Sequence, residues 1–466
     1  MVPEAVVVRV KDTQTAAVGR ERVLRPAIVA AVSVVLVASI SSFGAPAHAL
    51  VYLALAAVAL LGPKAAVQAL ALSWLATFLN PGIFSRSEAA EMLRWLVIAS
   101  AFTSVALRSV RLSMRLPAPV IGVAVFSVVA TTTSVLTSYA PDVSIVKVLS
   151  FFMVAFTVLM AFDLTRGDAR FWRTWFVSFV GVIIVLGFVF VGSELGYTRN
   201  ARGFQGLLNH PQLYGSFLAP VLAYLFFLRW RASLPRYLSR VLVAVGAVSL
   251  VLTQARVGAV ALLIGAGVAG VWWALQLARR GAVRVDGRVL AAGLAGALVL
   301  IPLGVRYSGA VQEGTTGFVF KRSSATQATE AFEASRGAPI ERSLRNFYAN
   351  PVLGIGFGVP SDPGQLRVSR VPVLGIPLGA PVEKGFTGTA VLEELGIVGF
   401  LFFLIMTVLV LRPAFRKRSG AAPAALAVAA FSVTIGESVL FAVGGHGLMT
   451  WIFLGLAGVL GRGDSH

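Results

Sequence analysis

Three arginines lie at predicted membrane boundaries where insertion does not require a positive charge. Arg199 and Arg202 precede a long apolar stretch, and Arg256 lies in a short turn between two others. A guanidinium at a membrane edge is costly unless it is paired or reaches water. Few acidic residues accompany these arginines in the sequence, and the planar guanidinium fits two phosphate oxygens at once. An anionic ligand is therefore one natural partner; lipid headgroups or a local ion pair are the alternative for each arginine.

A polar segment, residues 306–390, carries further basic residues. Arg342 and Arg345 are three positions apart in a predicted amphipathic helix, 340–349, which an Asn-Pro pair should end. They would share one face of that helix, either as anion ligands or as part of an ordinary solvated surface. The glycine-rich turn 354–358 follows, but no βαβ unit surrounds it, so it does not predict a dinucleotide site.

Two histidines and one carboxylate are the other candidates for proton chemistry. His210 directly precedes an apolar stretch and His446 lies in a glycine-rich turn, and each could accept a proton near pH 7. A histidine at a helix end more often caps the helix. Glu437 lies within an apolar stretch, where a carboxylate is a functional hypothesis by default, with Arg94 or Lys147 as its partner. A structural ion pair is the alternative.

The composition defines the elements that must position these residues. Of 466 residues, 57% are hydrophobic and 13% are charged, about half the charged fraction of a soluble domain. The apolar residues form blocks close to the ~20 residues that a membrane-spanning helix needs, without the alternation of a β-barrel. The sequence predicts an all-α polytopic membrane protein. The net charge of +20 comes largely from basic residues between spans, so nucleic acid is not an expected partner.

We expect about 12–14 transmembrane helices and one large extracytoplasmic loop. The predicted organisation is a tail at 1–26, helices 1–11 within 27–305, the loop at 306–390, helices 12–14 within 391–461 and a tail at 462–466. The second and third spans are closely spaced and could be half-helices, which would lower the count. The fourteen candidate spans are 27–43, 48–62, 64–79, 91–107, 118–137, 143–163, 174–192, 210–228, 238–253, 257–276, 289–305, 391–411, 422–441 and 446–460.

Basic residues alternate between the two sides of these spans. The connections predicted to be cytoplasmic carry most of them, including Arg170, Arg412, Arg416 and Arg462, whereas several short outer connections carry none. Under the positive-inside rule, this alternation places both termini in the cytoplasm. A preference for Ala, Gly and Arg over Lys indicates a GC-rich genome, and the bacterial cell membrane is the expected location.

Four stretches together resemble the O-antigen ligase / O-antigen polymerase superfamily of bacterial membrane glycosyltransferases. The likeness covers about residues 130–460, and the order of the stretches around one long outer loop is its most specific feature. The stretches are Arg202-Gly203-Phe204 through Asn209-His210-Pro211 to Gly215, Gln254-Ala255-Arg256-Val257-Gly258, Asn350-Pro351-Val352-Leu353-Gly354-Ile355-Gly356, and Leu392-Glu393-Glu394-Leu395-Gly396-Ile397-Val398-Gly399.

The resemblance implies an inverting sugar transfer on the outer face. The donor would be a polyprenyl-pyrophosphate-linked glycan, the acceptor a hydroxyl on a lipid or glycan, and the surroundings membrane lipids. Arg202 and Arg256 match the family's motif arginines and would hold the pyrophosphate, without a metal or cofactor. The supporting basic residues are Arg199, Arg342, Arg345 and Lys384.

One departure from the family concerns the base. The ligases carry a histidine shortly before the fourth stretch, where this chain reads Val-Glu-Lys-Gly-Phe-Thr at 382–387. Glu383 could replace it as base if burial raised its pKa, and His210 is the second candidate. The loss also permits a non-catalytic membrane component. A transporter of lipid-linked oligosaccharide or anions is the rival from another class, although internal repeats, a common transporter feature, are not detected.

Overall fold

The computed structural model describes residues 24–84, 89–112, 115–199, 203–228, 236–279, 337–370, 375, 377–379, 382, 384–416, 420–436 and 438–462. The fold is helical, as predicted, with one small hairpin, β1 (Ser369–Arg370) and β2 (Pro377–Gly379). The α-helices after the N-terminal helix Leu24–Ser41 are α2 (Ala45–Ala59), α3 (Pro63–Phe78), α4 (Ala90–Arg111), α5 (Ala118–Thr137), α6 (Pro141–Leu164), α7 (Ala169–Phe188), α8 (Pro211–Phe227), α9 (Arg236–Thr253), α10 (Arg256–Arg279), α14 (Ala338–Ala349), α15 (Thr387–Leu411), α16 (Ala421–Gly436) and α17 (His446–Leu460).

The helix lengths and surfaces are those of a multi-pass membrane protein. Seven described helices are long and apolar enough to cross a membrane, and five shorter helices are also apolar. Large apolar side chains such as Leu61, Val110 and Phe226 are 70–76% exposed, which suits a surface covered by lipid. Thirteen predicted spans coincide with a described helix, and the remaining one, 289–305, lies outside the described residues.

Helices α2 and α3 correspond to the two closely spaced spans that were predicted as possible half-helices. They have 15 and 16 residues, or about 22–24 Å at 1.5 Å per residue, which is less than the ~30 Å hydrocarbon thickness. Helix α3 lies within the protein, with Leu70, Trp74 and Leu75 at 0–1% exposure. The number of full crossings therefore stays a prediction.

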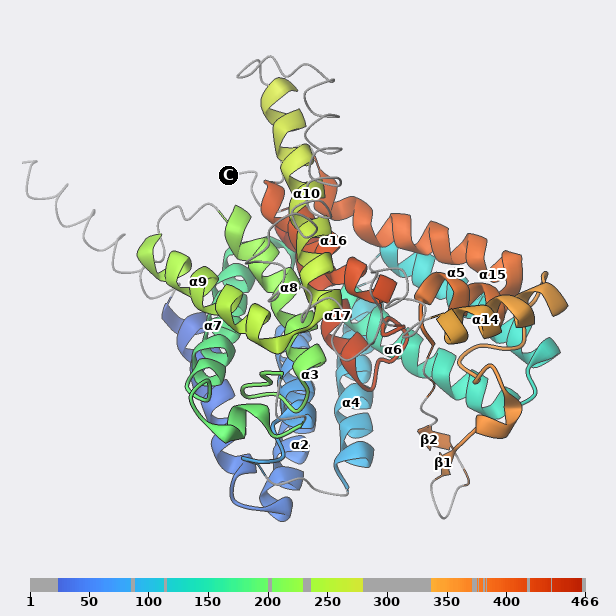
Figure 1. Cartoon of the computed structure of the whole chain (residues 1–466), viewed down its shortest axis with the longest axis horizontal. Helices are drawn as coiled ribbons and strands as arrows, with labels where there is room; N and C mark the ends of the chain where they lie inside the picture. Colours follow the sequence, from blue (N-terminus) through green and yellow to red (C-terminus); the bar gives the residue numbers. More distant parts are fainter. Residues whose placement is uncertain are drawn as a thin grey trace, which may run out of the picture.

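Helices that are distant in sequence form the centre of the bundle. Figure 1 shows α8, α10, α16 and α17 in the middle, α5, α6, α14 and α15 to one side, and α7 and α9 to the other. Helices α10 and α16 approach closely at Gly265, where an added Cβ would lie only 2.6 Å from the Cβ of Ala429. Small residues permit such backbone contact between membrane helices.

The described part of the polar segment is attached to the bundle by an aromatic cluster. The ring of Phe357 lies 5.1 Å from that of Phe441 and 6.3–6.4 Å from those of Phe126 and Phe151, between ring centroids. These edge-on and tilted contacts are favourable geometries for aromatic pairs. The chain after α14 is therefore anchored between α5 and α6.

Helix α15 is broken at Gly396, whose φ of 63° and ψ of −165° are not helical. The glycine-rich turn lies against this break: the N–H of Ile355 donates to the carbonyl of Glu393 at 3.0 Å, and that of Ile397 donates to Pro351 at 2.9 Å. The predicted helix at 340–349 is confirmed as α14, and its C-cap is Asn350.

Candidate functional site

The first two motif stretches lie against each other through close backbone contacts. The N–H of Phe204 donates to the carbonyl of Leu252 at 2.9 Å. A Cβ on Gly215 would lie 2.2 Å from the Cβ of Ala255, and one on Gly258 would lie 2.6 Å from the carbonyl oxygen of Gly215. No larger side chain fits at these contacts. The glycines therefore allow the start of α8 to touch the start of α10.

Arg256 begins α10 directly after a strained turn. Gln254 has a φ of 54°, a left-handed conformation that costs a non-glycine residue roughly 1 kcal/mol. The hydroxyl of Thr253 accepts the N–H of Ala255 at 3.1 Å and fixes the turn. The Arg256 side chain is partly buried, and none of the described carboxylates pairs with it. A positive group at a helix N-terminus, beside N–H groups with no helical partner, suits an anion.

A buried amide network shapes the loop that precedes α8. Asn80 donates to the carbonyls of Leu195 and Gly206 at 2.7 and 3.0 Å, and Gln205 donates to the Thr198 hydroxyl at 2.7 Å. Asn80 and Gln205 are both 0% exposed. Sequence reasoning missed this network; the Asn-Pro-Gly sequence after α3 is a turn signal but does not reveal a partner more than 100 residues away.

The same network orients the backbone at one predicted anion ligand. The side-chain oxygen of Gln205 accepts the backbone N–H of Arg199 at 2.9 Å. The Arg199 side chain itself is exposed. Arg202, the other arginine of this loop, lies outside the described residues, although the neighbouring Phe204 contacts the chain just before the Arg256 turn.

His210 acts as the N-cap of α8, which supports the capping alternative. Its Nδ1 accepts the backbone N–H of Gln212 at 3.1 Å. In the neutral ring, Nε2 then carries the proton, so neither nitrogen can accept a second one while the cap is intact. His446 is close enough to His210 for the two imidazoles to interact electrostatically, and its ring packs edge-on against Phe78 at 5.2 Å.

A small, mostly apolar cavity lies beside His446, between α3, α8, α16 and α17. Its volume is about 20 Å³, enough for one water molecule. Trp74 Nε1, Ser216 Oγ and His446 Nδ1 line it or lie beside it and have no hydrogen-bond partner within the described ranges. Pro220 also lines the cavity and lacks the N–H that would otherwise bond the Ser216 carbonyl. A water there would satisfy several of these groups.

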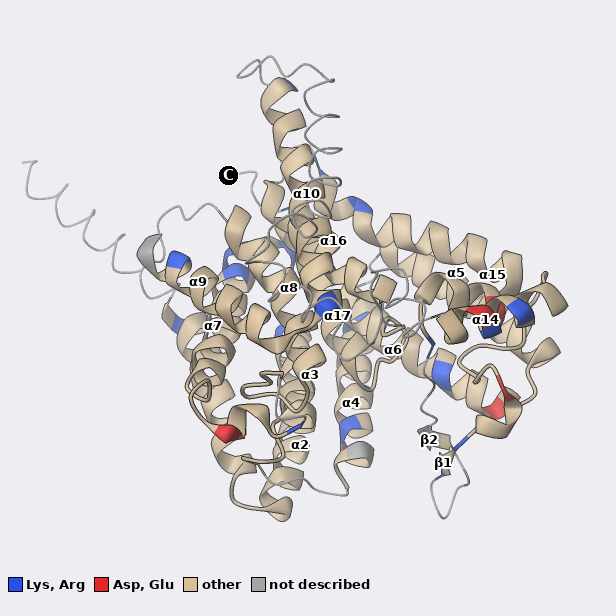
Figure 2. Cartoon of the chain, in the orientation of Figure 1, with Lys and Arg blue, Asp and Glu red and all other residues tan. Residues whose placement is uncertain are grey.

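The last two motif stretches enclose a cluster of buried charges. Lys384 Nζ lies 2.8 Å from Glu393 Oε2 and 3.3 Å from Glu394 Oε1, and the three side chains are 2%, 0% and 7% exposed. Lys147 from α6 donates to the carbonyl of Gly358 and lies close enough to Glu394 to interact electrostatically. Two ammonium groups thus balance two carboxylates. Figure 2 shows acidic and basic residues side by side next to α14.

Hydrogen bonds complete this cluster and attach the loop to α15. Ser343 and Asn346 of α14 each donate to Glu393 at 2.7 Å, and the N–H of Gly358 donates to Glu394 at 2.8 Å. The Tyr139 hydroxyl donates to the carbonyl of Pro360 at 2.8 Å. Burial, followed by the nearby Glu393 carboxylate, raises the pKa of Tyr139 above its usual range. The cluster fixes α14 and the glycine-rich turn in place.

The basic residues predicted in the loop have different environments. Arg342 is exposed on α14, and Arg345 forms a 3.1 Å ion pair with Glu341, with side chains 75% and 73% exposed. The solvated-surface alternative therefore describes Arg345 well. Lys384 is buried between two carboxylates, which neutralise the charge that was expected to support phosphate binding. Glu383 and Glu437 lie outside the described residues.

The two motif pairs meet at the C-terminal end of α16. The Thr387 hydroxyl, at the start of α15, donates to the carbonyl of Thr434 at 2.7 Å. Two residues further along, a Cβ on Gly436 would lie 2.5 Å from the Val257 side chain at the start of α10. The Arg256 turn and the buried charge cluster therefore lie on the same face of the bundle, on either side of α16.

Comparison of the chain with models of protein families and with curated proteins finds no match. The fold and the membrane class are therefore those that the helices define: a polytopic, all-α membrane protein. The resemblance to the O-antigen ligase and polymerase superfamily stays a prediction from the four sequence stretches.

Proposed function

We propose that this chain is a glycosyltransferase of the O-antigen ligase or polymerase type in a bacterial cell membrane. It would transfer a polyprenyl-pyrophosphate-linked glycan to a hydroxyl acceptor during assembly of a surface polysaccharide. The observation that carries the proposal is the position of Arg256. Its guanidinium is partly buried at the face where the motif stretches meet, and no described carboxylate neutralises it.

The reaction assigns a specific task to this group. The acceptor oxygen forms a bond to the anomeric carbon as the bond from that carbon to the pyrophosphate breaks, so the configuration inverts. Polyprenyl pyrophosphate leaves with the bonding electrons, and a base takes the hydroxyl proton. Arg256 and the first N–H groups of α10 would stabilise the negative charge that develops on the leaving group.

Two described side chains can be compared as candidates for the base. His210 uses Nδ1 to cap α8, and the Glu393 carboxylate accepts three hydrogen bonds from other side chains. The one basic nitrogen of neutral His210 is engaged by the cap, and Glu393 is 0% exposed and paired with Lys384, so neither group is placed to take a proton from an acceptor. Glu383 remains our hypothesis, because it lies in the segment that leads into α15.

A transporter or a non-catalytic component that handles lipid-linked oligosaccharide or anions is the second candidate. The break in α15 at Gly396 favours it, because interrupted helices often line transporter binding sites. The two functions differ in their products, since transport moves a lipid-linked glycan without breaking its link to pyrophosphate.

The test compares Arg256→Ala, Arg256→Lys and the control Arg367→Ala in a deletion strain of the source bacterium. Arg367 is an exposed arginine in the loop. We expect Arg256→Ala to lower the yield of polymer or glycan-capped lipid about 100-fold or more, Arg256→Lys to restore part of it, and Arg367→Ala to be neutral. Normal glycan linkage and chain length in a membrane-inserted Arg256→Ala protein would contradict the enzyme. Free polyprenyl pyrophosphate should accumulate only when transfer occurs, which separates the enzyme from the transporter.

A further inference from the structure

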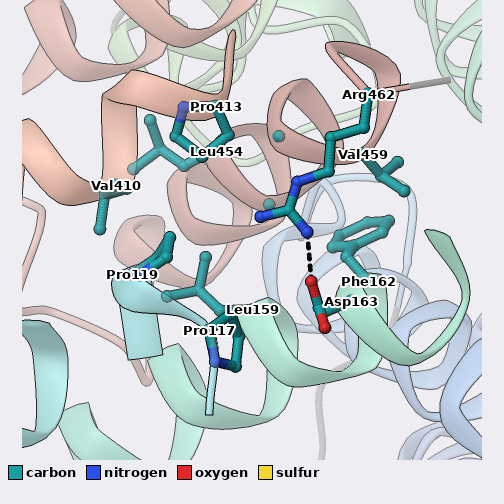
Figure 3. Close-up of a pocket in the computed structure, with 12 residues that line it drawn as sticks. Pro117, Pro119, Leu159, Phe162, Asp163, Val410, Pro413, Leu454, Val459 and Arg462 are labelled. Atoms are coloured by element: carbon teal, nitrogen blue, oxygen red, sulfur yellow. Dashed lines mark hydrogen bonds and ion pairs between the residues drawn. The ribbon is translucent and has the colours of Figure 1, made fainter. Parts of the chain in front are cut away.

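A second pocket lies at the opposite end of the bundle from α14. It is formed by the start of α5 and the ends of α6, α15 and α17. It is partly open to the surface, and its cavity volume is about 30 Å³, on the same measure that gives about 20 Å³ for the cavity beside His446. Pro117, Leu159, Val410 and Leu454 supply apolar walls (Figure 3). This face is the one that the alternation of basic residues predicts to be cytoplasmic.

One guanidinium reaches into this apolar pocket. Arg462, just after α17, donates through Nη1 to Asp163 of α6 (Figure 3). Its Nε is buried and has no hydrogen-bond partner in the part of the chain that the structure describes. A guanidinium has five N–H donors, and a single carboxylate oxygen cannot satisfy them. Donors therefore remain for a ligand that carries several acceptor oxygens.

Among the residues that the structure describes, positive charge exceeds negative charge around the pocket. Burial, followed by repulsion from Arg462 and Arg412, lowers the pKa of Arg416. Asp163, which pairs with Arg462, is the described carboxylate that acts on Arg416. An anion would relieve their mutual repulsion.

We propose that this pocket binds the phosphate of an anionic phospholipid. Arg462 would bond the phosphate oxygens at the mouth of the pocket, because they fit a guanidinium in pairs, while the glycerol and the acyl chains stay outside in the leaflet. The cytoplasmic leaflet is rich in anionic lipids. The site is separate from the face that carries Arg256, so it does not depend on the proposed glycosyl transfer.

The test uses the purified full-length chain in a neutral detergent. Phosphatidylglycerol or phosphatidylcholine is titrated in, bound lipid is counted by native mass spectrometry, and the melting temperature is measured with and without lipid. The variants are Arg462→Gln and a matched control, Arg170→Gln, which removes an exposed arginine from the same face. We expect phosphatidylglycerol to bind the wild type and the control, and Arg462→Gln to bind it about tenfold more weakly or worse.

Two further measurements test the site even if Arg462→Gln folds poorly. Asp163→Asn leaves all guanidinium donors to the ligand, so it should bind phosphatidylglycerol at least as tightly as the wild type. The proposal would be overturned if Asp163→Asn bound phosphatidylglycerol more weakly than the wild type, or if the wild type bound phosphatidylcholine as tightly as phosphatidylglycerol. It would also be overturned if Arg462→Gln and Arg170→Gln lost phosphatidylglycerol binding equally. A melting shift produced equally by inorganic phosphate would make this a site for a free anion rather than for a lipid.

Discussion

Replacing Lys384 by methionine should destabilise the protein far more than removing an arginine from the loop surface. Lys384 lies 2.8 and 3.3 Å from two carboxylates and is only 2% exposed. Its loss leaves the cluster with a net negative charge in a place that water does not reach. Breaking a buried ion pair in this way costs about 3–5 kcal/mol, although uptake of a proton by one carboxylate would lower that cost.

Two further variants separate charge from packing. Arg345→Met breaks an ion pair whose side chains are 75% and 73% exposed, which is worth roughly 0.3–0.5 kcal/mol. Lys384→Met combined with Glu393→Gln restores the balance between Lys147 and Glu394, so it should recover part of the lost stability. The assay is thermal unfolding of the purified protein in detergent. The reasoning is refuted if Lys384→Met and Arg345→Met have the same melting temperature, or if the double variant is less stable than Lys384→Met.

Three smaller predictions concern helix contact and pH. Gly258→Ala should lower the melting temperature, because its Cβ would lie 2.6 Å from the Gly215 carbonyl oxygen and overpacking costs about 1–3 kcal/mol. Gly267→Ala in the same helix meets nothing within 4 Å and should be neutral or slightly stabilising; equal melting of the two variants would contradict the close-contact argument. The pKa of Tyr139 is raised from 10.0 in the folded protein. The neutral hydroxyl therefore stabilises the folded state fully below pH 10.0, and this stabilisation is lost as pH rises through the folded pKa. Tyr139→Phe should therefore lose less stability in alkali than the wild type, in melts between pH 9 and 11 (roughly the range that brackets a free tyrosine), and an unchanged alkaline slope would argue against this role.

The helical fold could be predicted from the length of the apolar blocks. In lipid, backbone N–H and C=O groups must hydrogen-bond within the protein, and outside a closed barrel only a helix allows this. The loop helix was also predictable, since Asn350 and Pro351 end it by local geometry. His210 carried a local signal as well: it precedes Pro211 at the first position of α8, where a capping residue is expected.

The buried charge cluster was not predictable, because burial depends on contacts between distant segments. In the sequence, Lys384 was one of several basic residues in a polar loop and was assigned to phosphate. In the structure, α14 and the glycine-rich turn enclose it with Glu393 and Glu394. Asn80 illustrates the same limit, since its partners lie more than 100 residues away and nothing in its local sequence identifies them.

The most direct test of the proposed function is the affinity of purified protein for polyprenyl pyrophosphate, the leaving group itself. Wild type, Arg256→Ala and the exposed-arginine control Arg367→Ala would be compared in detergent at constant salt. We predict that Arg256→Ala binds at least about tenfold more weakly and that the control binds like the wild type. Equal affinity of the wild type and Arg256→Ala would contradict the assignment of this arginine to the pyrophosphate.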